Sequence, residues 1–161
     1  MHIEMVIKGL MVDPITNMPI IILRDRDGQR VLPIWVGIFE ANAIALQIEN
    51  INTPRPMTHD LLRNIIEDLQ ATVQKVVVTD LKENTFYALI HLQRNGESMA
   101  VDARPSDAIA LALRARAPIF VDDAVIDNAK SVDFAPEKAD QERLQKWLEN
   151  LDPEEFGKYK M

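Results

Sequence analysis

Cysteine is absent from this chain of 161 residues. The absence excludes disulfides, zinc–cysteine centres, iron–sulfur clusters and thiol nucleophiles. The chain also lacks a basic N-terminal segment followed by an apolar stretch, and no run approaches the ~18 uncharged apolar residues of a membrane-spanning helix. We therefore expect neither a signal peptide nor a membrane span, and we expect a cytoplasmic protein.

Positive charge is in short supply, because 18 lysines and arginines face 25 aspartates and glutamates, for a formal net charge of −7. This balance disfavours a broad surface that coats nucleic acid, although a few well-placed arginines are enough for a small phosphate site. The sequence also lacks His-x-His, His-Glu-x-x-His, Gly-x-Ser-x-Gly and glycine-rich phosphate-loop motifs. Short motifs therefore leave the reaction class open.

Hydrophobic periodicity predicts an α+β domain. Apolar runs bounded by turn residues predict strands at residues 2–12, 18–23, 29–36, 73–81, 86–94, 97–103 and 119–121. Apolar residues at helical spacing predict helices at residues 38–50, 58–71, 107–116 and 137–151, and residues 122–135 are expected to be irregular. The order β-β-β-α-α followed by β-β-β-α suggests two unequal copies of one unit. We expect a mixed or mostly antiparallel sheet with helices packed on it.

The tetrapeptide Ala-Ile-Ala-Leu occurs twice, at residues 43–46 and 108–111. Alignment of the two copies places Asn42 on Asp107, and each copy follows a strand-like run and a polar corner. Both predicted helices are apolar around most of their circumference, which indicates that they are buried. A duplicated strand–corner–helix unit is one interpretation, and chance similarity between two alanine-rich helices is the other.

The helix predicted at residues 58–71 has the clearest amphipathic pattern in the chain. Thr58 is expected to be its N-cap, and an apolar stripe is expected to face the core. The stripe consists of Leu61, Leu62, Ile65, Ile66 and Leu69. We expect a domain at residues 1–125 and an acidic extension at residues 126–161, whose helix at 137–151 packs on the core or contacts a partner protein.

Three polar corners lie where helices are expected to start, at residues 37–42, 54–60 and 102–107. Free backbone N–H groups and the helix dipole favour anions at such places, and phosphate is one such anion. If the corners converge, they supply carboxylates for a metal, arginines for phosphate and one imidazole for proton transfer. The candidate residues are Glu40, Arg55, His59, Asp102, Arg104, Ser106 and Asp107.

Most candidates also have a purely structural interpretation. Glu40 and Asp107 fit as acidic residues of a first helical turn, and Ser106 fits as an N-cap. His59 borders an apolar stripe, as a half-buried structural histidine does. Arg104 could brace a neighbouring aspartate instead of binding a substrate.

Four stretches of the chain, in this order, together resemble the bifunctional nuclease domain family. They are Leu32-Pro33-Ile34-Trp35-Val36-Gly37, Glu40-Ala41-x-Ala43-Ile44, Arg55-Pro56-x-Thr58-His59-Asp60-Leu61 and Asp102-Ala103-Arg104-Pro105-Ser106-Asp107-Ala108-Ile109-Ala110-Leu111. The resemblance covers residues 1–125, and the last stretch is its most specific part. It implies a compact α+β domain and, because plant members of the family degrade both RNA and DNA, a nuclease activity. It implies no particular catalytic residues, because none is firmly assigned in the family.

The leading hypothesis is a phosphodiesterase that acts on RNA, DNA or both with the help of Mg²⁺ or Mn²⁺. Glu40, Asp102 and Asp107 would hold the ion, because hard cations prefer carboxylate oxygens. Asp102 suits this role because it lies at a strand end, where no cap is needed. His59 would transfer a proton, and the two aspartates complete the candidate catalytic set.

Phosphate binding would fall to Arg55, Arg104 and Ser106, since guanidinium groups bind phosphate oxygens in pairs. The alternative is a non-enzymatic module that binds an anion or nucleotide, or that contacts proteins and forms homo-oligomers. The acidic charge of the chain favours this alternative. The nuclease hypothesis requires that Glu40, His59, Asp102 and Arg104 line one cavity.

Overall fold

The computed structural model describes residues 1–129. Its strands are β1 (His2–Val12), β2 (Pro19–Asp25), β3 (Val31–Trp35), β4 (Thr72–Lys82), β5 (Thr85–Arg94), β6 (Glu97–Ala103) and β7 (Ile119–Asp122). Its helices are α1 (Ile38–Ile48), α2 (Thr58–Asp68), α3 (Pro105–Ala115) and α4 (Asp123–Ala129). The predicted α+β class and the order of the first ten elements are confirmed. None of the described helices is long and apolar enough to cross a bilayer.

The strands form one mixed sheet in the order β3-β2-β1-β7-β4-β5-β6. Two antiparallel three-stranded meanders make its halves, and β7 joins them between β1 and β4. Val121 illustrates the junction, because it is paired with Ile3 of β1 on one side and with Val78 of β4 on the other. The β4–β7 pair is the parallel one among the described strands.

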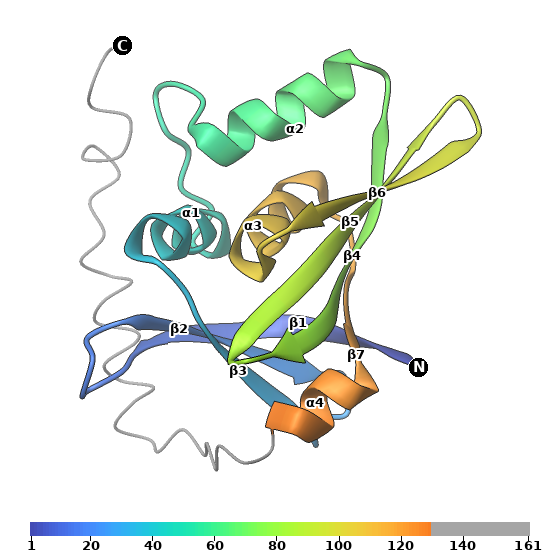
Figure 1. The fold of residues 1–161 in the computed structure, drawn as a ribbon. Coiled ribbons are helices and arrows are strands. Elements are labelled where there is room, and N and C mark those ends of the chain that lie inside the picture. The colour runs from blue at the N-terminus through green and yellow to red at the C-terminus, as the bar shows by residue number, and fades with distance from the viewer. Residues whose placement is uncertain (130–161) are drawn as a thin grey trace.

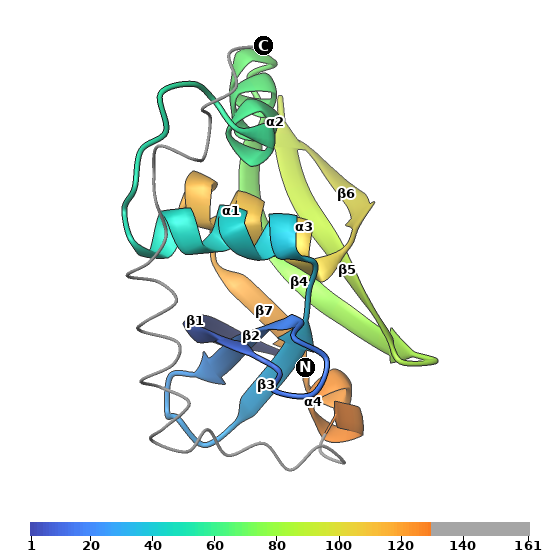
Figure 2. The same ribbon diagram turned by 90° about the vertical axis from the view of Figure 1, so that its left-hand side faces the viewer.

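Helices α1 and α3 lie side by side in the angle between the two halves of the sheet (Figures 1 and 2). α1 contacts β2, and α3 contacts β4 and β5. Both copies of Ala-Ile-Ala-Leu are buried there, which explains why these helices are apolar on nearly all sides. Their alanines leave room for close approach of the two helix axes.

Helix α2 departs from its predicted form in two ways. Its N-cap is Met57 rather than Thr58, because the Asp60 carboxylate accepts a 2.9 Å hydrogen bond from the Met57 backbone N–H and closes the first turn. The predicted buried stripe is also only half buried. Leu62 and Ile66 pack against the core, whereas Leu61, Ile65 and Leu69 remain 53%, 48% and 54% exposed. The described part of the chain leaves the outer side of the stripe uncovered, because α2 rests on α3 along one edge (Figure 2).

Helix α4 corrects the prediction that residues 122–135 are irregular. The Asp122 carboxylate accepts a 3.0 Å hydrogen bond from the Ala124 backbone N–H, and Val125 and Ile126 are buried against β4 and β7. Because α4 is short, it lacks the repeated apolar spacing that identifies longer helices. The predicted domain boundary at residues 125/126 falls within α4. The helix predicted at residues 137–151 lies outside the described residues.

Candidate functional site

Arg104 links the first turns of α1 and α3. Its Nη2 lies 2.7 Å from Oε1 of Glu40 and 2.8 Å from Oδ2 of Asp107, and its Nε donates to the same Asp107 oxygen at 2.9 Å. These bonds hold the pKa of Arg104 above its ordinary value, with the Glu40 hydrogen bond as the largest cause and the Asp107 hydrogen bond next. Arg104 is therefore a fixed positive charge, although two-thirds of its side chain (66%) is exposed.

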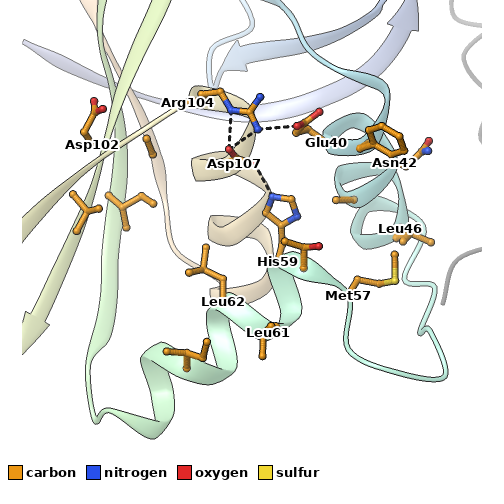
Figure 3. A pocket seen from close by; sticks show the side chains of 17 residues that line it. Glu40, Asn42, Leu46, Met57, His59, Leu61, Leu62, Asp102, Arg104 and Asp107 are labelled. Atoms are coloured by element: carbon orange, nitrogen blue, oxygen red, sulfur yellow. Dashed lines mark hydrogen bonds and ion pairs between the residues drawn. The ribbon is translucent and has the colours of Figure 1, made fainter. Parts of the chain in front are cut away.

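His59 extends this arrangement to α2. Its Nε2 lies 2.9 Å from Oδ1 of Asp107, the oxygen that Arg104 does not use. Glu40, Arg104, Asp107 and His59 thus form a continuous chain of hydrogen bonds across three helices, which we call the polar cluster (Figure 3). His59 is buried, with 8% of its surface exposed, so the imidazole is held between the helices.

Local sequence explains why these side chains meet. Arg104 is the extended N-cap residue of α3, and Pro105 opens the helix with a backbone angle already suited to it. Asp107 and Glu40 lie in first helical turns, where the positive end of the dipole stabilises a carboxylate. Gly37 leaves room for the Glu40 carboxylate, because a Cβ atom at position 37 would collide with Oε2 of Glu40. The predicted first-turn positions of Glu40 and Asp107 therefore place both carboxylates within reach of Arg104.

A cavity of about 800 Å³ opens beside the polar cluster. Glu40, His59, Asp102 and Arg104 all line it, as the nuclease hypothesis requires. The rest of the wall is mainly apolar and includes Leu46, Met57, Leu61, Leu62, Ile65, Ile90 and Val101. Phe39 is the aromatic residue of the lining, and 85% of its surface is exposed.

Three of the candidate residues lie outside the polar cluster. Asp102 is exposed on β6, and its side chain has no hydrogen bond or ion pair within residues 1–129. Its carboxylate points away from the cluster (Figure 3). Arg55 lines a different cavity. Ser106 is buried in the first turn of α3 and does not line the large cavity. Ser106 is also not an N-cap, because Arg104 holds that position.

The predicted metal ligands Glu40, Asp102 and Asp107 do not converge on one point in this structure. Among residues 1–129, no group of three or more histidines and carboxylates lies close enough to hold an ion. Glu40 and Asp107 already bind the Arg104 guanidinium, and Asp102 is turned away from both (Figure 3). A divalent ion at the predicted ligands would therefore have to displace Arg104 and bring Asp102 closer.

Sequence reasoning missed the ion pair that fastens the three helices together. Arg114 is buried, and its Nε donates to Oδ1 of Asp60 at 2.7 Å. Its Nη2 donates to the Ala43 carbonyl of α1 at 3.0 Å, and its Nη1 donates to the Ala110 carbonyl at 2.9 Å. The sequence held one indication of where Arg114 points. Arg114 follows Asp107 by about two helical turns, so the two side chains lie on the same face of α3.

Comparison with known proteins agrees with the fold and the motifs. The family model for the bifunctional nuclease domain matches residues 21–133. The chain belongs to this family. An uncharacterized protein of Mycobacterium tuberculosis (strain ATCC 25618 / H37Rv) is 38% identical over 164 residues, which cover 95% of this chain and 97% of that protein.

Plant members of the bifunctional nuclease domain family match over a shorter length. Bifunctional nuclease 1 of Oryza sativa subsp. japonica is 30% identical over 112 residues, which cover 67% of this chain and 34% of the rice protein. Bifunctional nuclease 2 of Arabidopsis thaliana is 29% identical over 105 residues, which cover 63% of this chain and 32% of that protein. The match thus covers about a third of each plant protein. Family membership supports a nuclease-like function for the domain.

Proposed function

We propose that this chain hydrolyses phosphodiester bonds of RNA or DNA at the polar cluster, with His59 as the group that transfers the proton. The observation that carries the proposal is the 2.9 Å contact between His59 Nε2 and Asp107 Oδ1 on the wall of an open cavity. A carboxylate that accepts from one imidazole nitrogen fixes the tautomer, so that the other nitrogen is a free base. Here the free nitrogen is Nδ1, which has no partner within residues 1–129.

The reaction then follows the chemistry of a general base. Nδ1 of His59 accepts a proton from water as the water oxygen forms a bond to phosphorus, and Asp107 stabilises the imidazolium. The P–O bond to the departing sugar oxygen breaks, and that oxygen takes up the proton. The products are a phosphomonoester and a free hydroxyl. Because water is the nucleophile, the same steps apply to RNA and to DNA.

Arg104 supplies the positive charge that this reaction needs. Its Nε and Nη2 are held by Asp107 and Glu40, whereas its Nη1 has no partner in the described residues and is drawn without a contact in Figure 3. A guanidinium held in this way can donate to a non-bridging phosphate oxygen where negative charge grows in the transition state. Glu40 has a positioning role, because it orients Arg104 rather than contacting the phosphate.

Phe39 favours a single-stranded substrate. An exposed aromatic side chain beside a cleavage site can stack on an unpaired base, which contributes about 1–3 kcal/mol per base. The net charge of −7 works against binding along a long duplex backbone. We therefore propose a strand end or a single-stranded region of RNA or DNA as the substrate.

Help from Mg²⁺ or Mn²⁺ is a separate proposal with Glu40, Asp102 and Asp107 as ligands. The proposed hydrolysis includes no ion, because Arg104 already binds two of these carboxylates. Cleavage measured with and without a chelator tests the ion directly. Activity that persists in the chelator supports proton transfer by His59 and Asp107 alone.

The experiment that tests the main proposal compares His59→Gln with His91→Gln. The purified full chain is incubated with labelled single-stranded RNA, single-stranded DNA and duplex DNA. We expect H59Q to lose about 10²–10⁴-fold in cleavage rate, because a general base is removed. His91 lies on β5 and does not line the cavity, so H91Q controls for loss of a histidine. Equal cleavage by both variants, with unchanged melting temperatures, would place the reaction elsewhere.

A second candidate function is assembly of a homo-oligomer. The observation in its favour is apolar exposure on two neighbouring elements. Leu61 and Ile65 of α2 and its C-cap residue Leu69 are about half exposed, and so are Met99 and Val101 of the edge strand β6. Exposed apolar surface of this kind marks interfaces, and an unpaired edge strand can pair with another copy.

A further inference from the structure

A second cavity, of about 320 Å³, lies beside the loop that joins α1 to α2. Unlike the first cavity, it is lined mainly by polar groups, among them Gln47, Asn52, Arg55, Arg63 and Asn64. Residues 56–60 separate the two cavities. Met57 and His59 line the first, whereas Pro56 and Asp60 line the second.

The charges around this second cavity are mainly positive. Arg55, Arg63 and Arg114 line it, against the single carboxylate of Asp60. Asp60 is already neutralised, because Arg114 donates to it at 2.7 Å. Arg55 and Arg63 have no carboxylate partner within residues 1–129, so two positive charges remain uncompensated.

The first cavity has the opposite balance. Its ionised side chains are Glu40, Asp102 and Asp107 against Arg104, which leaves an excess of negative charge. That excess weakens the attraction of a phosphate chain to the first cavity, whereas the second cavity attracts it. Although the protein as a whole carries a net charge of −7, this local excess of arginine suits an anion.

The Arg63 guanidinium and the backbone of Arg55 are also held in place before any ligand binds. Arg63 donates through Nε and Nη2 to Oδ1 of Asn64 at 3.3 and 3.0 Å, which leaves Nη1 and the Asn64 amide nitrogen as donors. Arg55 lies between Pro54 and Pro56, whose rings restrict the backbone on both sides. Thr53 Oγ1 donates to the Arg55 carbonyl at 2.7 Å and fixes the turn further. This order reduces the conformational entropy that is lost in the Arg63 side chain and the Arg55 backbone when an anion binds.

We propose that this second cavity is a phosphate subsite, in which Arg55 and Arg63 hold a backbone phosphodiester of the nucleic acid away from the bond that is cut. The inference rests on the proposed nuclease function. The subsite supplies the affinity that the acidic reaction cavity lacks, and residues 56–60 connect the bound phosphate to His59. Free phosphate or a mononucleotide would offer the same chemistry, and the experiment separates these sources.

The test measures binding of a fluorescein-labelled single-stranded oligonucleotide by anisotropy at several salt concentrations. The full chain is compared with Arg55→Gln/Arg63→Gln and with Arg30→Gln/Arg94→Gln. The control removes the same charge from two exposed arginines that line neither cavity. We expect R55Q/R63Q to weaken binding roughly tenfold or more at low salt. The slope of the logarithm of the binding constant against the logarithm of the salt concentration should become shallower by about 1.4. Each lost phosphate contact contributes about 0.7 to this slope on a single strand. Affinity and slope equal to those of the control would overturn the subsite.

Two further measurements separate the subsite from the nuclease proposal. If H59Q abolishes cleavage while R55Q/R63Q cleaves and binds like its control, the nuclease stands and the subsite falls. If R55Q/R63Q loses oligonucleotide binding in a chain that cleaves nothing, the subsite stands and hydrolysis falls. Inorganic phosphate and a mononucleotide are each added to the protein at increasing concentration, and the melting temperature is measured. A rise that depends on Arg55 and Arg63, without oligonucleotide binding, would overturn the assignment to a nucleic acid backbone.

Discussion

His59 Nε2 lies 2.9 Å from Asp107 Oδ1, although 48 positions separate the two residues in the chain. The contact joins α2 to α3 at the edge of the larger cavity. The same aspartate holds Arg104 through its other oxygen, so one carboxylate orients both the imidazole and the guanidinium. Groups fixed in this way need no rearrangement when a substrate binds.

Asp107→Asn tests this relationship while the size of the side chain is kept. We expect kcat to fall by about 10²–10⁴-fold with a small change in KM, because an amide does not stabilise the imidazolium. Asp102→Asn is the matched comparison, since Asp102 lines the same cavity but contacts neither His59 nor Arg104. Near-normal cleavage by D102N supports the proton-transfer mechanism. A loss as large as that of D107N would instead support a metal ion held by the carboxylates.

Arg114→Met tests how the three helices are fastened. The substitution keeps much of the volume but leaves Asp60 without its buried partner, so we expect the free energy of unfolding to fall by about 3–5 kcal/mol. Urea denaturation measures the change. Arg94→Met, at an exposed arginine without a partner in the described residues, should alter stability by less than about 0.5 kcal/mol. Similar stability of the two variants would mean that the Arg114–Asp60 pair does not hold the helices.

The environment of His91 leads us to expect that the folded protein loses stability in weak acid. Partial burial, followed by the charges of Lys75 and His2, holds the pKa of His91 below its ordinary value of 6.5. As the pH falls below 6.5, the unfolded chain binds a proton that the folded chain accepts only at lower pH, so the free energy of unfolding decreases. H91Q should reduce this decrease in urea denaturation between about pH 7.5 and 5.5. An equally steep decrease in H91Q would assign the effect to other groups.

Leu61→Glu/Ile65→Glu tests the homo-oligomer. Charges on the exposed side of α2 would disrupt an apolar interface between copies, so we expect the molar mass from light scattering to fall toward that of one chain. Gln29→Glu/Thr85→Glu adds the same two negative charges at exposed positions outside α2 and β6, and serves as the control. A single-chain mass for the unaltered protein at high concentration would rule out this assembly.

The sequence was most informative where a pattern repeats along a single helix or strand. The buried helices α1 and α3 followed from their nearly uninterrupted apolar residues, and the alternative that Arg104 braces Asp107 matches the observed hydrogen bond. The three helix-start corners also indicated where polar groups gather. These features depend on residues close together in the chain, so local pattern is enough to find them.

Relations between distant elements were not accessible in the same way. Which side of α2 remains uncovered, and which cavity receives Arg55, depend on how α2 rests on α3. The pairing of Arg114 with Asp60 likewise depends on helix packing rather than on spacing. Asp102 precedes Asp107 by only five residues, yet its strand directs the carboxylate away from the cluster (Figure 3).

The central place of β7 has a consequence for how the protein is made. The ribosome releases this strand after the other six strands of residues 1–129, yet β1 and β4 both depend on it for their second neighbour. Until residue 122 has emerged, a nascent chain carries two half-sheets with open inner edges, and such edges attract other chains. Any shortened chain that ends before Ile119 is therefore expected to aggregate rather than to form a smaller working unit.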